Sequence, residues 1–129
     1  RHYPEMAAGL AASDGQGPSL LFLPHLVPLQ RGILATIYVR TVTLPTAAEV
    51  SNLLRTAYAG EPFIEVCDQP PQLKDVAGTN FCRIFSTVDE RSGRIVVLSA
   101  IDNLMKGACG QALQNLNVML GLDEQEGLL

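Results

Sequence analysis

The longest alternating stretch of the chain is residues 31–43, where successive side chains would point to opposite sides of an extended backbone. One side would carry Ile33, Ala35, Ile37 and Val39, and the other Leu34, Thr36, Tyr38 and Arg40. The β-branched residues in this stretch favour a strand over a helix. We therefore predict a strand that is long enough to be central in a sheet or to form part of an interface.

Further strands are predicted from shorter patterns. Residues 81–89 and 94–101 are rich in β-branched residues and are connected by the polar segment 90–93, which ends in Gly93. A glycine in such a short polar connection predicts an antiparallel hairpin. Apolar runs at residues 20–23 and 62–67 predict two additional short strands.

Three helices are predicted. Pro4 suits the first turn of a short helix that ends near residues 9–13. Thr46 and Glu49 form a TxxE capping box, and apolar residues then repeat at helical spacing until Gly60. Residues 107–120 form the third helix, and Gly121 is its stop. One face of this last helix would carry Ala108, Ala112, Leu116 and Met119.

The order of these elements predicts an α+β fold, in which a mixed or antiparallel sheet of about four to six strands is covered by two or three helices. A chain of 129 residues is expected to form one domain, residues 1–129. Because residue 1 is Arg instead of Met, we expect this domain to be part of a longer chain.

Charge and composition narrow the possible functions. The net charge of −4 and the absence of a Lys/Arg run argue against a nucleic-acid surface. Apolar stretches are too short to cross a bilayer, because prolines and polar residues interrupt even residues 20–43. Nine scattered basic residues suit one or two small anionic groups. We therefore expect a small-molecule partner, with neither nucleic acid nor membrane involved.

The junction from Asp102 to Ala112 joins an apolar strand to the last helix through charged, amide and glycine residues. Lys106 could meet a phosphate or carboxylate there, together with backbone N–H groups at the helix start. The alternative is a solvated surface lysine. The same two interpretations apply to Arg31, and residues 78–80 could either offer amide groups to a ligand or turn the chain.

Two histidines are candidates for chemistry. His2 lies between Arg1 and a predicted helix start, where an imidazole can act as a general base near an anionic substrate. The alternative for His2 is an exposed side chain at a loose terminus. His25 lies among apolar residues and two prolines, which predicts a hydrogen-bonded histidine in a rigid turn and makes it a second-choice site residue. Because no HxH or HExxH spacing occurs, we expect no metal site.

The cysteines Cys67, Cys82 and Cys109 are too widely spaced for a CxxC zinc site and are odd in number, so a reducing, cytoplasmic location is expected. We predict a structural, buried role for all three. Since no GxGxxG fingerprint occurs, the chain is expected to lack a nucleotide-binding domain of its own.

Several blocks, in one order, resemble the C-terminal half of the N-acetyl-gamma-glutamyl-phosphate reductase family. They include Arg1-His2 with Pro4-Glu5, Pro24 to Pro28, Arg31 to Thr36, Glu61-Pro62-Phe63, Asn80-Phe81-Cys82, Ser99 to Gly107 and Gly110-Gln111-Ala112. Tyr3 stands where that family often has threonine, and Cys109 where it usually has alanine.

The resemblance implies a substrate-binding and dimerisation domain like the C-terminal domain of glyceraldehyde-3-phosphate dehydrogenase-like enzymes. In the family, an acyl phosphate is reduced to an aldehyde through a cysteine thioester and a hydride from NADPH. The resemblance implies proton transfer by His2, with the substrate anchored by Arg1, Arg31 and Lys106. It also implies that Asn115 approaches the nicotinamide. The catalytic cysteine and most NADP contacts would lie in the part that precedes this chain.

Two functions therefore stay open. The first is part of an NADPH-dependent reductase that converts N-acetyl-glutamyl phosphate to N-acetyl-glutamate semialdehyde in arginine biosynthesis, with this chain inactive alone. The second is a stand-alone dimerisation or small-anion-binding module without redox activity. Under either function, an exposed apolar face on the last helix would favour self-association into a homo-oligomer.

Overall fold

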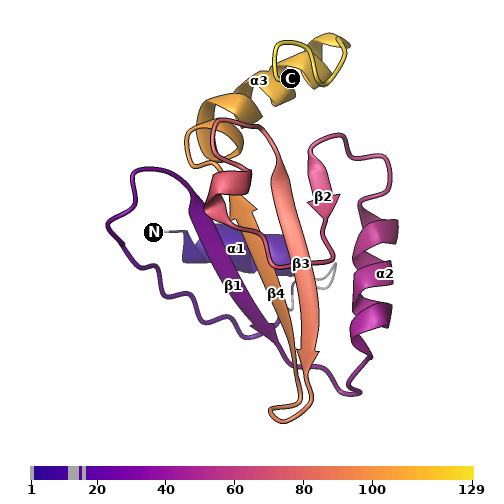
Figure 1. Ribbon diagram of the computed structural model, residues 1–129. Helices are drawn as coiled ribbons and strands as arrows, with labels where there is room; N and C mark the ends of the chain where they lie inside the picture. Colours follow the sequence, from indigo (N-terminus) through magenta and orange to yellow (C-terminus); the bar gives the residue numbers. More distant parts are fainter. Residues whose placement is uncertain (1, 12–14, 16) are drawn as a thin grey trace.

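A four-stranded mixed sheet forms the centre of the computed structural model, which describes residues 2–11, 15 and 17–129 (Figure 1). Its strands are β1 (Ile33–Val39), β2 (Ile64–Val66), β3 (Cys82–Asp89) and β4 (Arg94–Ile101), in the spatial order β1-β4-β3-β2. Strand β4 pairs antiparallel with β1 and β3, whereas β2 runs parallel to β3. The predicted α+β fold, mixed sheet and hairpin are therefore confirmed.

The helical elements are α1 (Tyr3–Leu10), α2 (Ala47–Ala57), the 3₁₀ turn η1 (Leu73–Asp75), the π-helical turn η2 (Met105–Cys109) and α3 (Gly110–Leu120). Helix α2 begins with the predicted capping box: the Thr46 hydroxyl accepts from the Glu49 N–H, and the Glu49 carboxylate accepts from the Thr46 N–H. The bonds from the backbone and side chain of Thr46 lower the pKa of Glu49. Gly121 ends α3 in the left-handed region, with a φ of 67°.

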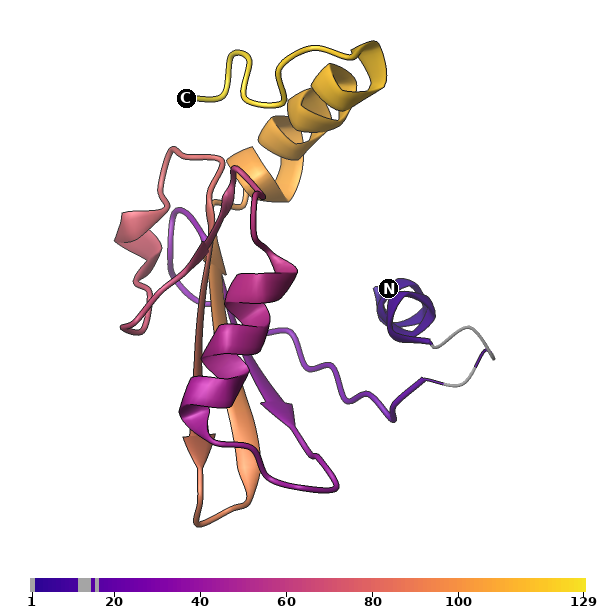
Figure 2. The ribbon, with the colours of Figure 1, turned by 90° about the vertical axis from the view of Figure 1, so that its right-hand side faces the viewer.

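The sheet has one covered face and one open face. Ile84, Ser86 and Ile95 share the covered face and are buried, as is Val50 of α2, which packs beside β3 and β2. The opposite face carries η1 near one end (Figure 2). We call the rest of this side the open face; its side chains are exposed or half-buried. They are Leu34, Tyr38, Phe85, Val96 and Leu98.

One predicted strand is absent, and another is shorter than predicted. Residues 20–23 form no strand, and Leu21 and Leu23 are exposed, because this segment pairs with no strand in the described part of the chain. The strand predicted for residues 31–43 is confirmed over the shorter range Ile33–Val39, and it lies at the edge of the sheet, so of the two positions that the sequence allowed it does not take the central one. Its edge position leaves the side chains of β1 exposed on both faces.

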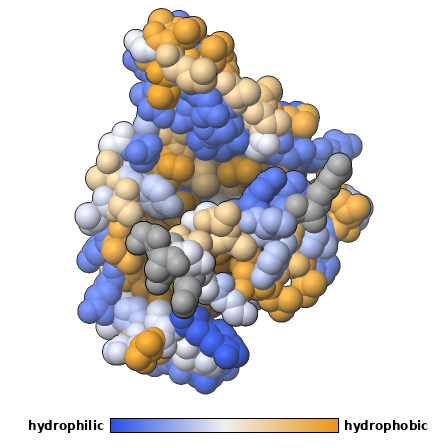
Figure 3. All heavy atoms as spheres, turned by 180° about the vertical axis from the view of Figure 1, so that it is seen from behind, coloured by the Kyte–Doolittle hydropathy of each residue, from blue (hydrophilic) through white to orange (hydrophobic). Residues whose placement is uncertain are grey.

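Apolar surface remains uncovered well beyond the sheet. Helix α1 stands apart from the sheet and contains no buried residue (Figure 2). The far end of α3 and the residues just after it expose a group of large apolar side chains: Leu116, Val118, Met119, Leu120 and Leu122. Hydrophobic atoms gather at the top of the view from behind (Figure 3). Extensive apolar surface of this kind is typical of a domain that contacts other domains or subunits. Among the described helices, none is long and apolar enough to cross a membrane.

Candidate functional site

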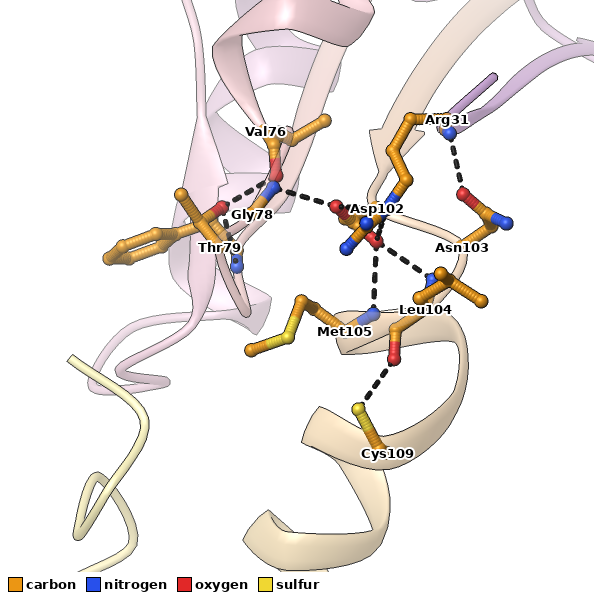
Figure 4. A network of polar contacts seen from close by, with 11 residues as sticks. Arg31, Val76, Gly78, Thr79, Asp102, Asn103, Leu104, Met105 and Cys109 are labelled. Atoms are coloured by element: carbon orange, nitrogen blue, oxygen red, sulfur yellow. Dashed lines mark hydrogen bonds and ion pairs between the residues drawn. The ribbon is translucent and has the colours of Figure 1, made fainter. Parts of the chain in front are cut away.

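One buried carboxylate, that of Asp102, organises the junction between β4 and the last helical segment (Figure 4). Its Oδ1 accepts hydrogen bonds from the N–H groups of Leu104 (2.7 Å) and Met105 (3.0 Å), and its Oδ2 accepts one from the N–H of Gly78 (2.7 Å). The Nε atom of Arg31 lies 3.1 Å from both oxygens. Asp102 thus connects the segment before β1, the loop after η1 and the start of η2.

These contacts change the interpretation of the junction. The N–H groups at the helix start, which the sequence suggests for an external anion, are bound by the chain's own carboxylate. Burial alone would raise the pKa of Asp102, but the hydrogen bonds from Gly78, Arg31, Leu104 and Met105 outweigh it and hold that pKa well below its usual range. Asp102 is therefore ionised at neutral pH, and residues 78–80 turn the chain while offering the Gly78 amide to Asp102.

Asn103 extends the same connection by one residue. Its Oδ1 accepts a hydrogen bond of 2.6 Å from the N–H of Gly32. Gly32 has a φ of 103°, and a Cβ atom there would lie 2.7 Å from the side chain of Leu73, so this position requires glycine. The consecutive residues Asp102 and Asn103 therefore hold Arg31 and Gly32, while the Arg31 side chain remains 41% exposed.

Lys106 is half-buried in a polar cluster next to this junction. Its Nζ donates a hydrogen bond of 2.6 Å to Gln114 Oε1 and lies 5.7 Å from the centroid of the Phe63 ring. Gln114 also accepts from Asn80 Nδ2 (3.0 Å) and donates to Glu124 (2.5 Å). Burial lowers the pKa of Lys106, and nearby anionic groups, including Glu124, oppose this shift. The bond to Gln114 uses one of the three N–H donors of the Lys106 ammonium.

Asn80 and Gly110 also contribute to this cluster; Asn80 belongs to the segment 78–80 that was a candidate from the sequence, whereas Gly110 was not a candidate site residue. Asn80 is fully buried, and its Oδ1 has no hydrogen-bond partner within the described residues. A Cβ atom on Gly110 would collide with this oxygen and would lie 2.9 Å from the carbonyl oxygen of Met105. Close contact between the Asn80 loop and the η2–α3 junction therefore depends on glycine at position 110.

The two histidines lie outside these clusters. His2 is the residue before α1; its side chain is 71% exposed, and its Nδ1 is 3.7 Å from a Glu5 carboxylate oxygen. His25 is exposed, and its Nδ1 donates to the carbonyl oxygen of Leu23 at 3.0 Å. Within the described part of the chain, no hydrogen bond or ion pair joins either histidine to Arg31 or Lys106. Arg1 is outside the described residues.

Helix α3 carries an amide pair on its outer side. Gln111 Nε2 donates a hydrogen bond of 2.8 Å to Asn115 Oδ1, and Asn115 is exposed. The Asn115 Nδ2 atom and the Gln111 Oε1 atom have no partner among the described contacts. This pair can therefore offer one amide donor and one amide acceptor to a ligand.

The cysteines do not form a reactive group together. Cys67 and Cys82 are half-buried, and burial, the largest effect, raises the pKa of Cys67. Cys109 is exposed, and its Sγ donates to the carbonyl oxygen of Leu104 at 2.7 Å, so the predicted burial of this residue is wrong. The reason is that Cys109 lies on the outer side of η2. Among the residues that the structure describes, no group of three His, Cys, Asp or Glu side chains is placed to hold a metal ion.

Sequence comparison relates this chain to known proteins. A family model described as "Semialdehyde dehydrogenase, dimerisation domain" matches residues 1–103. An N-acetyl-gamma-glutamyl-phosphate reductase of Desulforudis audaxviator is 52% identical over 100% of the chain, and one of Dehalococcoides mccartyi is 50% identical over 99%. The chain spans 38% of the length of each of these relatives.

Structural comparison gives the same fold. The crystal structure of aspartate semialdehyde dehydrogenase II from Vibrio cholerae matches 74% of the chain and 29% of its own, with a TM-score of 0.60 and 24% sequence identity. The same protein in complex with ASA matches with a TM-score of 0.59. At this identity, the likeness shows a shared fold.

Proposed function

The chain belongs to the semialdehyde dehydrogenase dimerisation-domain family, and from this premise we propose that it is the C-terminal part of an N-acetyl-gamma-glutamyl-phosphate reductase. The observation that carries this proposal is the identity of 50–52% to named reductases along the whole chain. The complete protein would reduce N-acetyl-glutamyl phosphate to N-acetyl-glutamate semialdehyde with NADPH, in arginine biosynthesis and in the cytoplasm. The chain alone would be inactive, since it spans 38% of these relatives.

In this proposal, His2 transfers a proton to or from the reacting substrate. Its exposed imidazole at the start of α1 is open to a substrate held by a neighbouring domain. The His2 Nδ1 atom lies 3.7 Å from a Glu5 carboxylate oxygen, so a negative charge stands beside the imidazole. The remaining candidates would contact the substrate or orient it: Arg1, Arg31, Lys106 and, as second choice, His25.

The NADP cofactor would be held mainly by the domain that precedes this chain. Asn115 and Gln111 fit an additional contact, because the amide donor and acceptor that they leave open complement a carboxamide such as that of nicotinamide. When bound, NADPH supplies the hydride. The residues of this chain would orient its ring from α3.

We also propose that the complete protein is a homo-oligomer assembled through this domain. The support is the description of the family as a dimerisation domain, together with the open face of the sheet. The same observations favour a second candidate function, a stand-alone dimerisation or small-anion-binding module without redox activity. The two candidates differ in whether the chain can restore turnover.

The decisive experiment joins this chain to the N-terminal part of the Desulforudis audaxviator relative and measures NADPH oxidation with N-acetyl-glutamyl phosphate. We expect no turnover from the chain alone and measurable turnover from the fusion. Substitution His2→Ala should lower kcat/KM of the fusion by roughly 10²-fold or more, because general acid–base catalysis is lost. Glu90→Ala, in the exposed hairpin connection, is the control and should leave turnover unchanged.

Each outcome decides between the candidates. A folded fusion without turnover would favour the binding module. Turnover that survives His2→Ala would remove the proton-transfer role from His2 while keeping the reductase proposal.

A further inference from the structure

We propose that Asp102 is a positioning residue that presents the guanidinium of Arg31 to an anionic group of the substrate, a role that rests on the function proposed above. Both Asp102 oxygens contact Arg31 through Nε alone, at 3.1 Å each. Within the described contacts, the two Nη groups of Arg31 have no partner. Because these groups point in a fixed fork, they are available to a second carboxylate or phosphate.

A second arginine of the chain, Arg83, has carboxylate partners for more than one of its guanidinium nitrogens. Arg83 donates from Nε to Glu65 (2.5 Å), and its Nη1 lies 3.8 Å from Asp75. Two carboxylates thus surround Arg83, whereas Arg31 has one, and the Arg31 side chain is more exposed (41% against 33%). The difference indicates a structural role for Arg83 and an incomplete charge pairing for Arg31.

The carboxylate that holds Arg31 is itself fixed. Asp102 receives three backbone N–H groups, from Gly78, Leu104 and Met105, which come from two separate segments. These bonds take up part of its negative charge, so the guanidinium is not fully neutralised. An arginine restrained in this way loses less conformational freedom when it binds an anion.

Asn103 restrains the backbone beside the same side chain. Its bond to the Gly32 N–H fixes the peptide that follows Arg31. Both ends of the arginine are therefore held, its backbone by Asn103 and its Nε by Asp102. The chemistry that this arrangement recognises is a pair of oxygens on a carboxylate or an acyl phosphate, and the proposed substrate carries both groups.

The test compares Arg31→Lys, Asp102→Asn and the double variant in the fusion protein. Lysine keeps the charge but lacks the fork, so Arg31→Lys should raise the KM for N-acetyl-glutamyl phosphate by about tenfold or more, with kcat changed by less than about threefold. Asp102→Asn should act in the same direction, and the double variant should be no worse than Arg31→Lys, because both act through one contact. Arg83→Lys is the matched control and should leave KM unchanged.

An unchanged KM in Arg31→Lys would overturn the proposal, as would an Asp102→Asn variant that lowers the melting temperature without affecting KM. If Asp102→Asn does not fold, the exposed Arg31→Lys variant still decides.

A second readout is independent of turnover: NMR titration of the 129-residue chain with inorganic phosphate. A saturable shift of the Arg31 side-chain signals supports the proposal, and no shift, or an equal shift at Arg83, overturns it. A fusion without turnover would count against the proposed reductase alone, and the titration would then judge Arg31.

Discussion

Asp102 is unusual among the residues of this domain because it keeps a negative charge in a fully buried position. Three N–H groups and one guanidinium surround it, and such charge-assisted hydrogen bonds replace the water that a carboxylate loses on burial. Removing the charge would leave these donors unsatisfied. The stability of the domain should therefore depend on the protonation of this single group.

The sign of the pH effect follows from the lowered pKa of Asp102. An unfolded aspartate has a pKa of about 3.9, so the stabilisation by ionised Asp102 is complete above about pH 5 and declines as the pH falls below about 4 towards the lower pKa of the folded state. We expect Asp102→Asn to lower the free energy of unfolding most at neutral pH, with a gap to wild type that narrows below about pH 4. Urea unfolding of both proteins between pH 7 and pH 3 measures this gap. A gap that stays constant down to pH 3 would contradict the assignment.

For single residues, the sequence predicts contacts to near neighbours in the chain but not contacts to distant segments. An acidic residue directly before a helix start is a known capping signal, so the contacts of Asp102 to Leu104 and Met105 could have been predicted. Its contacts to Arg31 and Gly78 could not, because they depend on how distant segments meet. Five proposed roles stay predictions, because the atoms that these residues would contact belong to other molecules or domains. The residues are His2, Arg31, Lys106, His25 and Asn115.

Among the elements, those set by local chemistry were predicted best. The capping box of α2 and the stop at Gly121 involve only neighbouring residues, and both are confirmed. The short strand expected at residues 20–23 is absent because a strand needs a partner, and an apolar run does not supply one. The π-helical turn before α3 was not predicted, because it forms where α3 meets the Asn80 loop.

The η2–α3 junction gives the prediction at this scale. Substitution Gly110→Ala places a methyl group against Asn80 Oδ1 and the Met105 carbonyl, where the backbone cannot yield without moving the turn. We expect a loss of about 1–3 kcal/mol in the free energy of unfolding, as for other overpacked sites. Gly9→Ala in α1 is the control, because no atom lies within 4 Å of its Cβ position. Equal unfolding midpoints in urea for Gly110→Ala and wild type would show that the junction relaxes freely.

At the scale of the whole molecule, the main feature is the large amount of apolar surface that stays exposed. The family description indicates dimerisation, and the sequence suggested the apolar face of the last helix as a surface for self-association. The structure offers two candidates: the open face of the sheet and the far end of α3. Polar groups frame the open face at the hairpin end, where a shallow hollow of about 400 Å³ is lined by Tyr38, Asp89, Ser92, Arg94 and Val96.

We expect the open face to mediate self-association. Tyr38→Glu should shift the chain towards a 13.9 kDa monomer, because a buried carboxylate without a partner is strongly unfavourable in an interface. Leu53→Glu on α2 is the matched control, since Leu53 and Tyr38 are similarly exposed (68% and 67%). Light scattering after size exclusion measures the mass of each variant. Dissociation by Met119→Glu but not by Tyr38→Glu would assign the contact to α3 instead.

The position of β1 at the sheet edge also has a consequence for the synthesis of the protein on the ribosome. This strand, ILATIYV, carries no charge, and among the described residues it pairs only with β4, which follows β1, β2 and β3 in the sequence. At a synthesis rate of about 5–20 residues per second, it leaves the ribosome several seconds before β4 exists. During that interval an uncharged, apolar strand meets solvent and other nascent chains with its pairing groups unused. A chaperone that binds the chain during translation should therefore raise the soluble yield of this domain.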